Sequence, residues 1–467
     1  MRRTLPFALL LACGPTTPSG ATQASGPSEP PSTTTTPWPT TTAAAEAAAT
    51  SNFDEGEVDL DIPPFDSEAL LQCSADGTCN LLDILIVVDN SSTMASEQKQ
   101  LATDLAGFVA GIRGLKDIHG LDVNADVNVM VTTTDMDGPT CNLFAKDGHV
   151  PAKGAPQNVV CTDHLERFTA FGGDPSVPET CTDVCLTPVV PLGPFINFTP
   201  DASNISSEGV GDPVVDALAC IVPSGIDGCF YESPLEAMLQ ALDPDKPWNQ
   251  GSMPFMRYGA TLAIVLLTDE SDCSIENGAH FDPANFADPA LTEFWPDSPT
   301  MPGEKDPPNS STCWRSSMDC EDIDADGTHE SCLTVDNDVL HPVDRYTTYL
   351  NDILGPQKDK TTVMLVLGGV PHGGVMDLEF RDWIDADIFP GELETAEQKQ
   401  YDFAIGPGCS ISSDRQALPP GRMIDVCKSL DRGDDLRCCI ASICDDTYAP
   451  ALECLTAALS RQFELPG

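Results

Sequence analysis

Four short, mostly apolar runs recur along the chain, and each has the length of one buried strand. They are residues 82–88 (LDILIVV), 127–134 (VNVMVTTT), 261–269 (TLAIVLLTD) and 362–367 (TVMLVL). None of them keeps a strict alternation of apolar and polar positions. Such runs are typical of strands that are buried on both faces of a parallel sheet.

Segments with helical spacing separate these runs. Apolar residues recur every three or four positions in 101–112, and similar patterns cover 231–242, 343–354 and 449–465. Strands that alternate with helices predict an α/β fold. We expect a Rossmann-like, doubly wound, mostly parallel sheet with helices on both faces.

The starts of two helices carry capping signals. Ser96 is the expected cap of the first helix. Ser233, with Pro234 and Glu236 behind it, matches a capping box with proline at the first helical position.

Three long segments interrupt the alternation, at about 138–228, 270–338 and 370–447, and each is rich in Gly, Pro, Asp and Cys. Loops of this length are unusual in a domain unless they are cross-linked or functional. The chain has 19 cysteines, but it lacks the Cys-x-x-Cys and His pairs of zinc fingers. We therefore expect inserts that are stapled by disulfides, which imply export to an oxidising compartment.

The amino terminus is typical of an exported lipoprotein. Two arginines precede a short apolar segment, and residues 10–13 (LLAC) are similar to a bacterial lipobox, in which Cys13 carries the lipid after a signal peptide of residues 1–13. Residues 14–72 are rich in Pro, Thr and Ser and end in an acidic stretch, which predicts a disordered tether. The folded domain would span 73–467, with the lipid as its only anchor on a bacterial outer membrane.

The charge of the chain disfavours two kinds of partner. Lysine and arginine total 23 and aspartate and glutamate total 73, so the net charge is −50. Such a charge disfavours binding to nucleic acid, whose phosphates need basic side chains, and adsorption to anionic lipid. It suits a soluble, exported surface.

Hard oxygen donors follow the first strand. Asp89, Ser91 and Thr93 occupy alternate positions after the apolar run, at the end of a strand where open α/β sheets bind ligands. A carboxylate and two hydroxyls suit Mg²⁺, Mn²⁺ or Ca²⁺. The alternative is a turn that caps the next helix. Asp269 ends the third strand, so it can converge with Asp89 on one cation if the two strands are neighbours.

The order Asp89-x-Ser91-x-Thr93 resembles the metal-ion-dependent adhesion motif of von Willebrand factor type A domains, and Asp269 matches the Asp that completes that site. The chain also resembles cysteine-rich type A lipoproteins of myxobacteria and their relatives, over about residues 73–370. The resemblance implies that the hydroxyls bind the metal directly, that the acids bind it directly or through water, and that an acid of a partner protein takes the open position.

Two positions depart from the family pattern. Glu232 stands where the family has a Thr, so it is either a third carboxylate at the metal, where it weakens the pull on an external acid or fills the open position, or a solvated acid near a helix N-terminus. Glu270 replaces the Gly that follows the metal-binding Asp in the family. We interpret Glu270 and Asp272 as surface acids rather than as further ligands.

A second cation site is a weaker candidate. Asp322, Asp324 and Asp326 alternate before Gly327, as in the first half of a calcium loop. The twelfth position is a leucine, so the segment is either a short calcium loop or a solvated acidic turn.

These features favour a non-enzymatic function. We expect a cell-surface lipoprotein whose type A domain binds Mg²⁺ or Mn²⁺, or Ca²⁺, and through it a protein or extracellular matrix ligand. One alternative is a metal-dependent hydrolase, for which His280 and His372 are the candidate bases. Another is a structural envelope protein with a degenerate metal site.

Overall fold

The computed structural model describes residues 80–137, 141, 149–170, 173, 175–206, 211–323, 325–329, 331–355, 360–373, 378, 380–413 and 415–464. The chain divides at residue 61, and every described residue belongs to the second unit, Ile62–Gly467. The signal peptide, the lipid site at Cys13 and the tether at 14–72 lie outside the described residues. No helix of the described part is long and apolar enough to cross a membrane.

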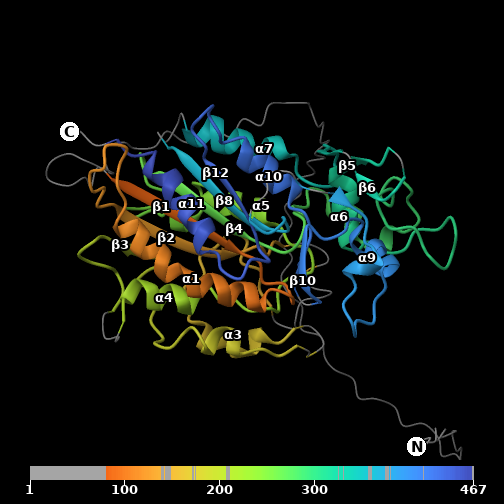
Figure 1. The fold of residues 1–467 in the computed structure, drawn as a ribbon, viewed down its shortest axis with the longest axis horizontal. Helices are drawn as coiled ribbons and strands as arrows, with labels where there is room; N and C mark the ends of the chain where they lie inside the picture. Colours follow the sequence, from red (N-terminus) through yellow and green to blue (C-terminus); the bar gives the residue numbers. More distant parts are fainter. Residues whose placement is uncertain are drawn as a thin grey trace, which may run out of the picture. The chain divides into compact units, whose positions relative to one another are not determined.

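A six-stranded sheet, ordered β12-β8-β4-β1-β2-β3, forms the centre of the fold (Figure 1). Its strands are β1 (Leu81–Val88), β2 (Asp126–Thr133), β3 (Ile196–Phe198), β4 (Thr261–Leu267), β8 (Thr362–Gly368) and β12 (Cys438–Ser442). All neighbours pair in parallel except β2 and β3. The predicted α/β class with a mostly parallel sheet is confirmed, and all four predicted strands form.

The order of the strands reverses beside β1. The chain passes from β1 outward to β2 and β3, and then returns to place β4 on the other side of β1. The carboxyl ends of the two strands at such a switch point border the crevice in which open α/β sheets bind ligands. Asp89 and Asp269 follow these two strands.

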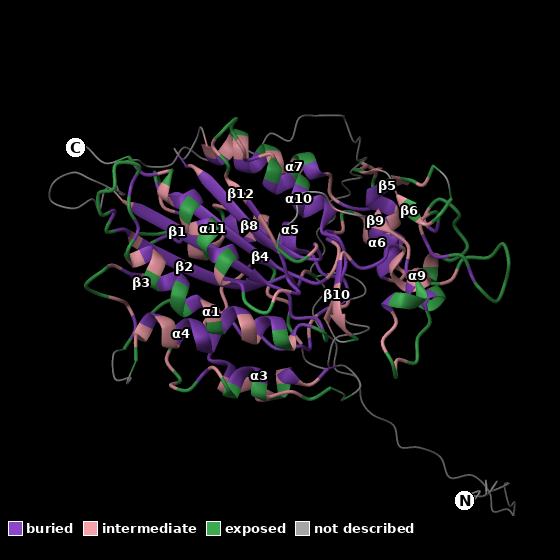
Figure 2. Cartoon of the chain, in the orientation of Figure 1, coloured by how far each residue is buried: buried purple, intermediate pink, exposed green. Residues whose placement is uncertain are grey.

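Helices cover both faces of the sheet. One face carries α1 (Ala95–Arg113), α4 (Pro213–Ile221) and α11 (Ala449–Ser460), and the other carries α5 (Pro234–Leu242), α7 (Val343–Thr348), the π-helical segment Tyr349–Leu354 and α10 (Gly421–Lys428). Successive residues of β1 point to opposite faces: Ile84 and Ile86 pack under α1, whereas Leu85 and Val87 pack under α5. The central strands β1, β4 and β8 are therefore buried along their whole length (Figure 2).

Two of the predicted inserts combine into one lobe. The lobe contains α6 (Ser310–Ser317), α9 (Ala396–Phe403), the pair β5 (Met318–Glu321) and β7 (Ser331–Thr334), and the pair β6 (Thr328–His329) and β9 (Phe380–Arg381). Because β6 comes from the second insert and β9 from the third, the lobe is built from both inserts. Trp314, Trp383 and Ile405 are buried together between them.

Other parts of the inserts join the main sheet or its edge. The strands β3 and β12, which the sequence did not predict, lie inside expected inserts. A hairpin of β10 (Cys409–Ser412) and β11 (Arg415–Ala417) reaches the end of β4, where Leu418 N donates to Asp269 O at 2.8 Å. The short helix α3 (Glu179–Thr182) belongs to the first insert.

Every described cysteine is in a disulfide, so the predicted stapling is confirmed for this part of the chain. The pairs are Cys141–Cys229, Cys161–Cys181, Cys185–Cys220, Cys273–Cys313, Cys320–Cys332, Cys409–Cys444, Cys427–Cys438 and Cys439–Cys454. Several of them close inserts against the scaffold, which compensates for the small apolar content of those segments.

Both predicted side-chain caps are wrong. The helix α1 begins at Ala95, and the Ser96 hydroxyl donates to Glu97 instead of capping. The Ser233 hydroxyl donates to the carbonyl of Cys273. Groups distant in the sequence take over at α5: Leu235 N donates to Asp272 Oδ1 at 3.1 Å and Glu236 N donates to Ser274 Oγ at 3.0 Å.

A buried ion cluster lies near the amino-terminal edge of the sheet. Asp83 of β1 accepts from Lys360 Nζ at 2.7 Å and from Arg257 Nε at 2.8 Å, and both Asp83 and Lys360 have fully buried side chains. Burial lowers the pKa of Lys360, although the charge of Asp83 acts against this shift. The charge of Asp83 is thus compensated twice.

Removing one partner should leave that charge under-compensated. We expect Lys360→Met to lower the free energy of unfolding by about 3 kcal/mol, since breaking a buried pair strands the remaining ion. Denaturant unfolding of the oxidised domain measures this. Lys116→Met breaks the exposed pair with Asp122 and should cost under about 1 kcal/mol. Equal losses in the two variants would contradict the interpretation.

Candidate metal centre

The carboxylate of Asp89 lies at the junction of β1 and β4. Its backbone N–H donates to Leu267 O at 2.9 Å, which continues the parallel ladder past the last strand residue. Its Oδ1 accepts from Ser91 N at 2.7 Å, and its Oδ2 accepts from Thr268 Oγ1 at 2.5 Å. Asp89 is fully buried. Two strand ends therefore fix one carboxylate.

The two hydroxyls of the motif lie together. Ser91 Oγ and Thr93 Oγ1 are 3.3 Å apart, and Ser91 is buried while Thr93 is exposed. The Thr93 hydroxyl also lies close enough to the carboxylate of Asp269 to lower its pKa. The motif is thus connected to both strand ends, and its outer side reaches solvent at Thr93.

Asp269 and Glu232 each present a buried oxygen that has no hydrogen-bond partner. These oxygens are Asp269 Oδ1 and Glu232 Oε1. The other oxygen of Glu232 accepts from the hydroxyl of Thr134, just beyond β2. Glu232 is fully buried and Asp269 is only 7% exposed. The interpretation of Glu232 as a solvated acid is therefore wrong, and the structure brings it together with the predicted ligands.

Burial and mutual repulsion raise the pKa values of these acids. Burial raises the pKa of Asp89 to about 6, against the hydrogen bonds from Thr268 and Ser91. Burial, followed by the charge of Asp89, raises the pKa of Glu232 and of Asp269 well above the usual range. The same two causes raise the pKa of Glu270 to about 8.

No basic side chain compensates this group in the part of the chain that the structure describes. Arg415 is paired with Glu97, at 3.0 Å, and with none of these acids. Asp83, on the same strand as the Asp89 motif, has two cationic partners. Buried charges are normally paired or coordinate a metal. The orphaned oxygens and the oxygen-rich donor set therefore fit a hard divalent cation.

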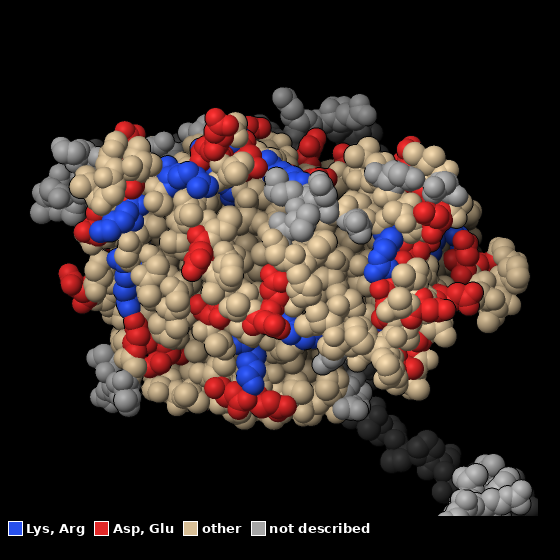
Figure 3. Space-filling model, in the orientation of Figure 1, with Lys and Arg blue, Asp and Glu red and all other residues tan. Residues whose placement is uncertain are grey.

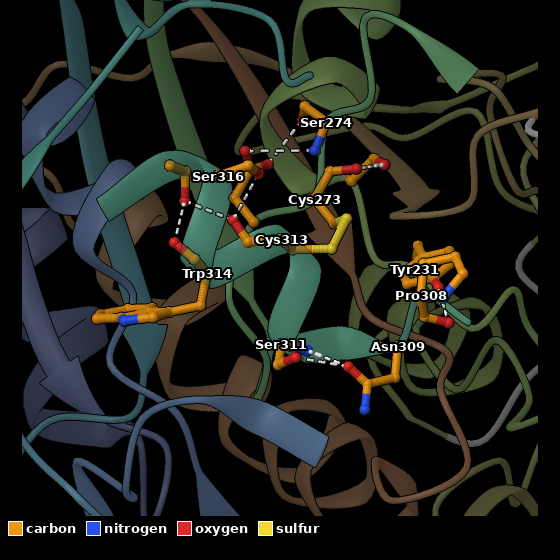
Figure 4. Close-up of a disulfide and its surroundings, with 12 residues drawn as sticks. Tyr231, Cys273, Ser274, Pro308, Asn309, Ser311, Cys313, Trp314 and Ser316 are labelled. Carbon is orange, nitrogen blue, oxygen red and sulfur yellow. Dashed lines mark hydrogen bonds between the residues drawn. A yellow bond between two sulfur atoms is a disulfide. The ribbon is translucent and has the colours of Figure 1, made fainter. Parts of the chain in front are cut away.

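Distant contacts hold the loop that follows Asp269. Asp272 is 1% exposed, and its Oδ2 accepts from Arg422 Nε of α10 at 2.9 Å while its Oδ1 caps α5. Its interpretation as a surface acid is wrong. Figure 4 shows the disulfide that joins Cys273 to Cys313 of α6 beside this loop. The loop is thus anchored to α5, to α10 and to the insert lobe.

A second polar layer, which the sequence does not predict, lies beside the motif. Asn90 Nδ2 donates to Asp135 Oδ2 at 2.6 Å, and His149 Nε2 lies 2.9 Å from the same oxygen. Burial disfavours the charged form of His149, but hydrogen bonds and charges of Asp135 and Asp227 outweigh it and raise its pKa to about 9. The layer ties β1, β2 and the loop before α5 together.

Cys141, His149 and Cys229 form the one described group of three acidic, histidine or cysteine side chains whose ligand atoms all lie within 4.8 Å of one another. The two sulfurs are bonded to each other in this structure. Because the thiolate is the ligand form of cysteine, this group could hold a metal only after reduction. No particular ion is indicated.

The weaker calcium loop lies elsewhere, in the insert lobe. Asp322 accepts from Asp326 N at 3.2 Å and from Gly327 N at 3.0 Å, so its carboxylate closes its own turn. Asp324 lies outside the described residues. Both interpretations of this segment stay open.

The two histidines considered for hydrolysis make contacts elsewhere. His280 is buried, with Nδ1 3.2 Å from Leu291 O and Nε2 3.4 Å from Asp338. His372 is exposed and its Nδ1 lies 2.8 Å from Asp445. Neither forms a hydrogen bond or ion pair with Asp89 or Asp269 among the described contacts.

Comparison with known proteins adds no assignment. No protein-family model and no curated protein sequence matches the chain.

The His149 layer predicts a pH dependence of stability. The folded pKa of about 9 lies above the ordinary histidine pKa of 6.5, so the ion pair contributes fully below pH 6.5 and is lost as the pH rises through 9. We expect His149→Gln to cost roughly 3 kcal/mol at pH 6 and little at pH 9.5. Urea unfolding at both pH values measures this, with the exposed His119→Gln as the control. A cost for His149→Gln that does not change with pH would contradict the assignment.

Proposed function

We propose that this domain binds one divalent cation at the carboxyl ends of β1 and β4 and uses it to bind an acidic group of a protein or matrix partner. The observation that carries the proposal is the set of buried carboxylates without a basic partner, two of which have orphaned oxygens. A cation removes both costs, because it supplies a ligand to each oxygen and lowers their repulsion.

The donors favour Mg²⁺ or Mn²⁺, with Ca²⁺ as a third possibility. Ser91 and Thr93 offer hydroxyl oxygens that are 3.3 Å apart, and Asp269 offers a carboxylate near Thr93. Among the described residues, no three carboxylates have oxygens that all lie within 4.8 Å of one another. Hydroxyls and water would therefore complete the coordination, with Asp89 and Glu232 acting directly or through water. Mg²⁺ commonly keeps several waters in protein sites.

The same features support a finer assignment of the fold. The switch point between β1 and β4, the order Asp89-x-Ser91-x-Thr93 and Asp269 at the end of β4 agree with the von Willebrand factor type A pattern. We therefore propose a type A-like domain. The exposed Thr93 gives an acid of the partner a route to the cation.

The disulfides support an exported location. Eight bridges among the described residues suit an oxidising compartment and not the bacterial cytosol. Together with the lipobox at residues 10–13, they favour a lipoprotein on the outer membrane or cell surface. Acidic side chains gather over the insert lobe in Figure 3, which suits a soluble, exposed surface.

Cation binding is tested by thermal unfolding of the folded, oxidised domain. At a hundredfold excess over the dissociation constant, Mg²⁺ or Mn²⁺ should add about 2.7 kcal/mol of stability. Asp269→Asn should abolish most of this gain, whereas Asp201→Asn, at an exposed position, should preserve it. No gain in the parent domain would favour a structural protein with a degenerate site. Turnover of ester, phosphate or peptide substrates that is lost in Asp269→Asn would favour the hydrolase.

The carboxyl groups of the metal-free protein should give a pH dependence of the same sign as the His149 pair, but at lower pH. Carboxyl groups with raised folded pKa values bind more protons when folded, so stability falls as the pH rises through about 6 for Asp89 and about 8 for Glu270. Asp269→Asn should flatten this fall between pH 5 and 8.5 and stabilise the metal-free domain at pH 8 by roughly 1–3 kcal/mol. Chelator-treated protein in urea gives the measurement. Destabilisation by Asp269→Asn at pH 8 would count against an unneutralised cluster.

A further inference from the structure

The Cys141–Cys229 bridge differs from the other described disulfides in what lies against it. A ring nitrogen of His149 and the two sulfurs all lie within 4.8 Å of one another. In the part of the chain that the structure describes, no other bridge has a histidine nitrogen or a carboxylate oxygen within this distance of both its sulfurs. This bridge therefore has an ionisable ring in immediate reach.

The contacts of His149 hold its ring in the charged form. Nε2 lies 2.9 Å from Asp135 Oδ2, and Nδ1 lies 3.7 Å from Asp227 Oδ1. Ionised carboxylates accept hydrogen bonds and do not donate them, so both ring nitrogens keep their protons. The ring is 2% exposed, and little water screens its charge. A buried cation beside a cysteine stabilises the thiolate and so favours opening of the disulfide.

A cavity of about 120 Å³ gives solvent a route to this buried bridge. Cys141 and Cys229 are each 3% exposed, and both line the cavity, whose wall also includes the exposed Asp137. Among the described residues the two cysteines form an apolar cluster of their own, separate from the larger clusters. A thiol on a small molecule or a slender side chain can therefore reach the sulfurs, and opening the bridge disrupts no larger apolar cluster.

The loop that carries Cys229 also supports the candidate metal centre. Cys229 N donates to Asp135 Oδ1 at 2.7 Å, and Gly228 N donates to Asn90 O at 3.0 Å. The approach is close, because a Cβ at Gly228 would lie 2.7 Å from the side chain of Asn90. Asn90 belongs to the Asp-x-Ser-x-Thr motif, and Glu232 follows Cys229 by three positions. The bridge thus clamps a loop that contacts the motif and carries one of the candidate ligands.

We propose that Cys141–Cys229 is a site of reversible thiol–disulfide exchange with a dithiol, and that its opening weakens cation binding at the neighbouring centre. The second half rests on the proposed function. A thiolate of the dithiol attacks one sulfur, the S–S bond breaks, and the other cysteine leaves as a thiolate beside His149. The second thiol of the dithiol then attacks the mixed disulfide. The two electrons and two protons of the dithiol end on the two cysteines, and the dithiol becomes a disulfide.

A redox titration tests the exchange. The oxidised full chain is equilibrated at neutral pH with graded ratios of reduced to oxidised dithiothreitol, quenched with acid and alkylated, and each cysteine pair is quantified by peptide mass spectrometry. Cys141–Cys229 should open at the least reducing ratio of the eight described bridges. The comparator is Cys439–Cys454, because Cys454 is exposed and access alone would open that bridge first. Prior opening of Cys439–Cys454, or opening of all bridges together, would overturn the proposal.

The variant His149→Gln tests the role of the histidine. Its Cys141–Cys229 bridge should need a roughly tenfold higher ratio of reduced to oxidised dithiol, which corresponds to about 30 mV. Asp135 offsets part of the ring's charge, so we expect no larger change. A merely destabilised fold would instead open its bridges more easily, in the opposite direction. The exposed His119→Gln should match the parent, and an unchanged or lower ratio in His149→Gln would contradict the proposal.

Manganese binding tests the effect on the centre. The parent is compared before and after selective opening of Cys141–Cys229, with the dithiol removed by gel filtration under argon. Free Mn²⁺ is measured by electron paramagnetic resonance, and this ion is a poor match for the new thiolates. The opened form should bind Mn²⁺ roughly tenfold more weakly, which corresponds to 1.4 kcal/mol.

The outcomes separate this proposal from the one beneath it. Equal Mn²⁺ affinities in the two forms would overturn the regulation and leave the cation site standing. If the oxidised protein binds no Mn²⁺, the cation site and its regulation fail together, while the order in which the bridges open still decides the exchange. Early opening of Cys141–Cys229, its delay in His149→Gln and weaker Mn²⁺ binding afterwards support the whole proposal.

Discussion

Repulsion among buried carboxylates at the carboxyl ends of β1 and β4 is the interaction on which this account depends. Asp83 lies near the start of β1 and Asp89 directly follows the end of that strand, and both are fully buried. Asp83 has Lys360 and Arg257 as partners, whereas the charge of Asp89 repels the buried carboxylates of Asp269 and Glu232. The fold supplies two cationic partners to Asp83 and none, among the described residues, to the acids around Asp89. This contrast is consistent with a metal ion that binds from solution beside Asp89.

The scaffold explains how these acids stay together despite their repulsion. The ladder of the parallel sheet fixes Asp89 and Thr268 side by side. The loop behind Asp269 is held by Arg422 and by the Cys273–Cys313 disulfide. Each anchor connects segments that are distant in the sequence, so the free energy of folding can offset the electrostatic cost. The insert lobe thus has a structural role at the site as well as a surface of its own.

The scaffold could largely be predicted from the sequence, because its strands are continuous apolar runs and its long helices keep one apolar face. The strands β3 and β12 could not, since three and five residues with polar members carry too little pattern. Asp89, Ser91, Thr93 and Asp269 were predictable as a group because each follows the end of a strand. Their proximity needed only the rule that parallel strands end at the same edge.

The remaining parts of the site depend on tertiary contacts that leave no local trace. Glu232 is buried, and its carboxylate accepts a hydrogen bond from the hydroxyl of Thr134, 98 residues earlier. The cap of α5 comes from Asp272 and Ser274, so the local capping signal at Ser233 was misleading. His149 has no motif around it, and only the fold brings it to Asp135.

Anomalous diffraction from a crystal grown with manganese tests the central claim most directly. The account predicts one manganese peak among Ser91, Thr93 and Asp269, with direct metal–oxygen bonds of about 2.1 Å, and with the carboxylates of Asp89 and Glu232 turned toward it. A crystal that binds manganese only at other places, with Asp89 and Asp269 pointing into separate cavities, would contradict it.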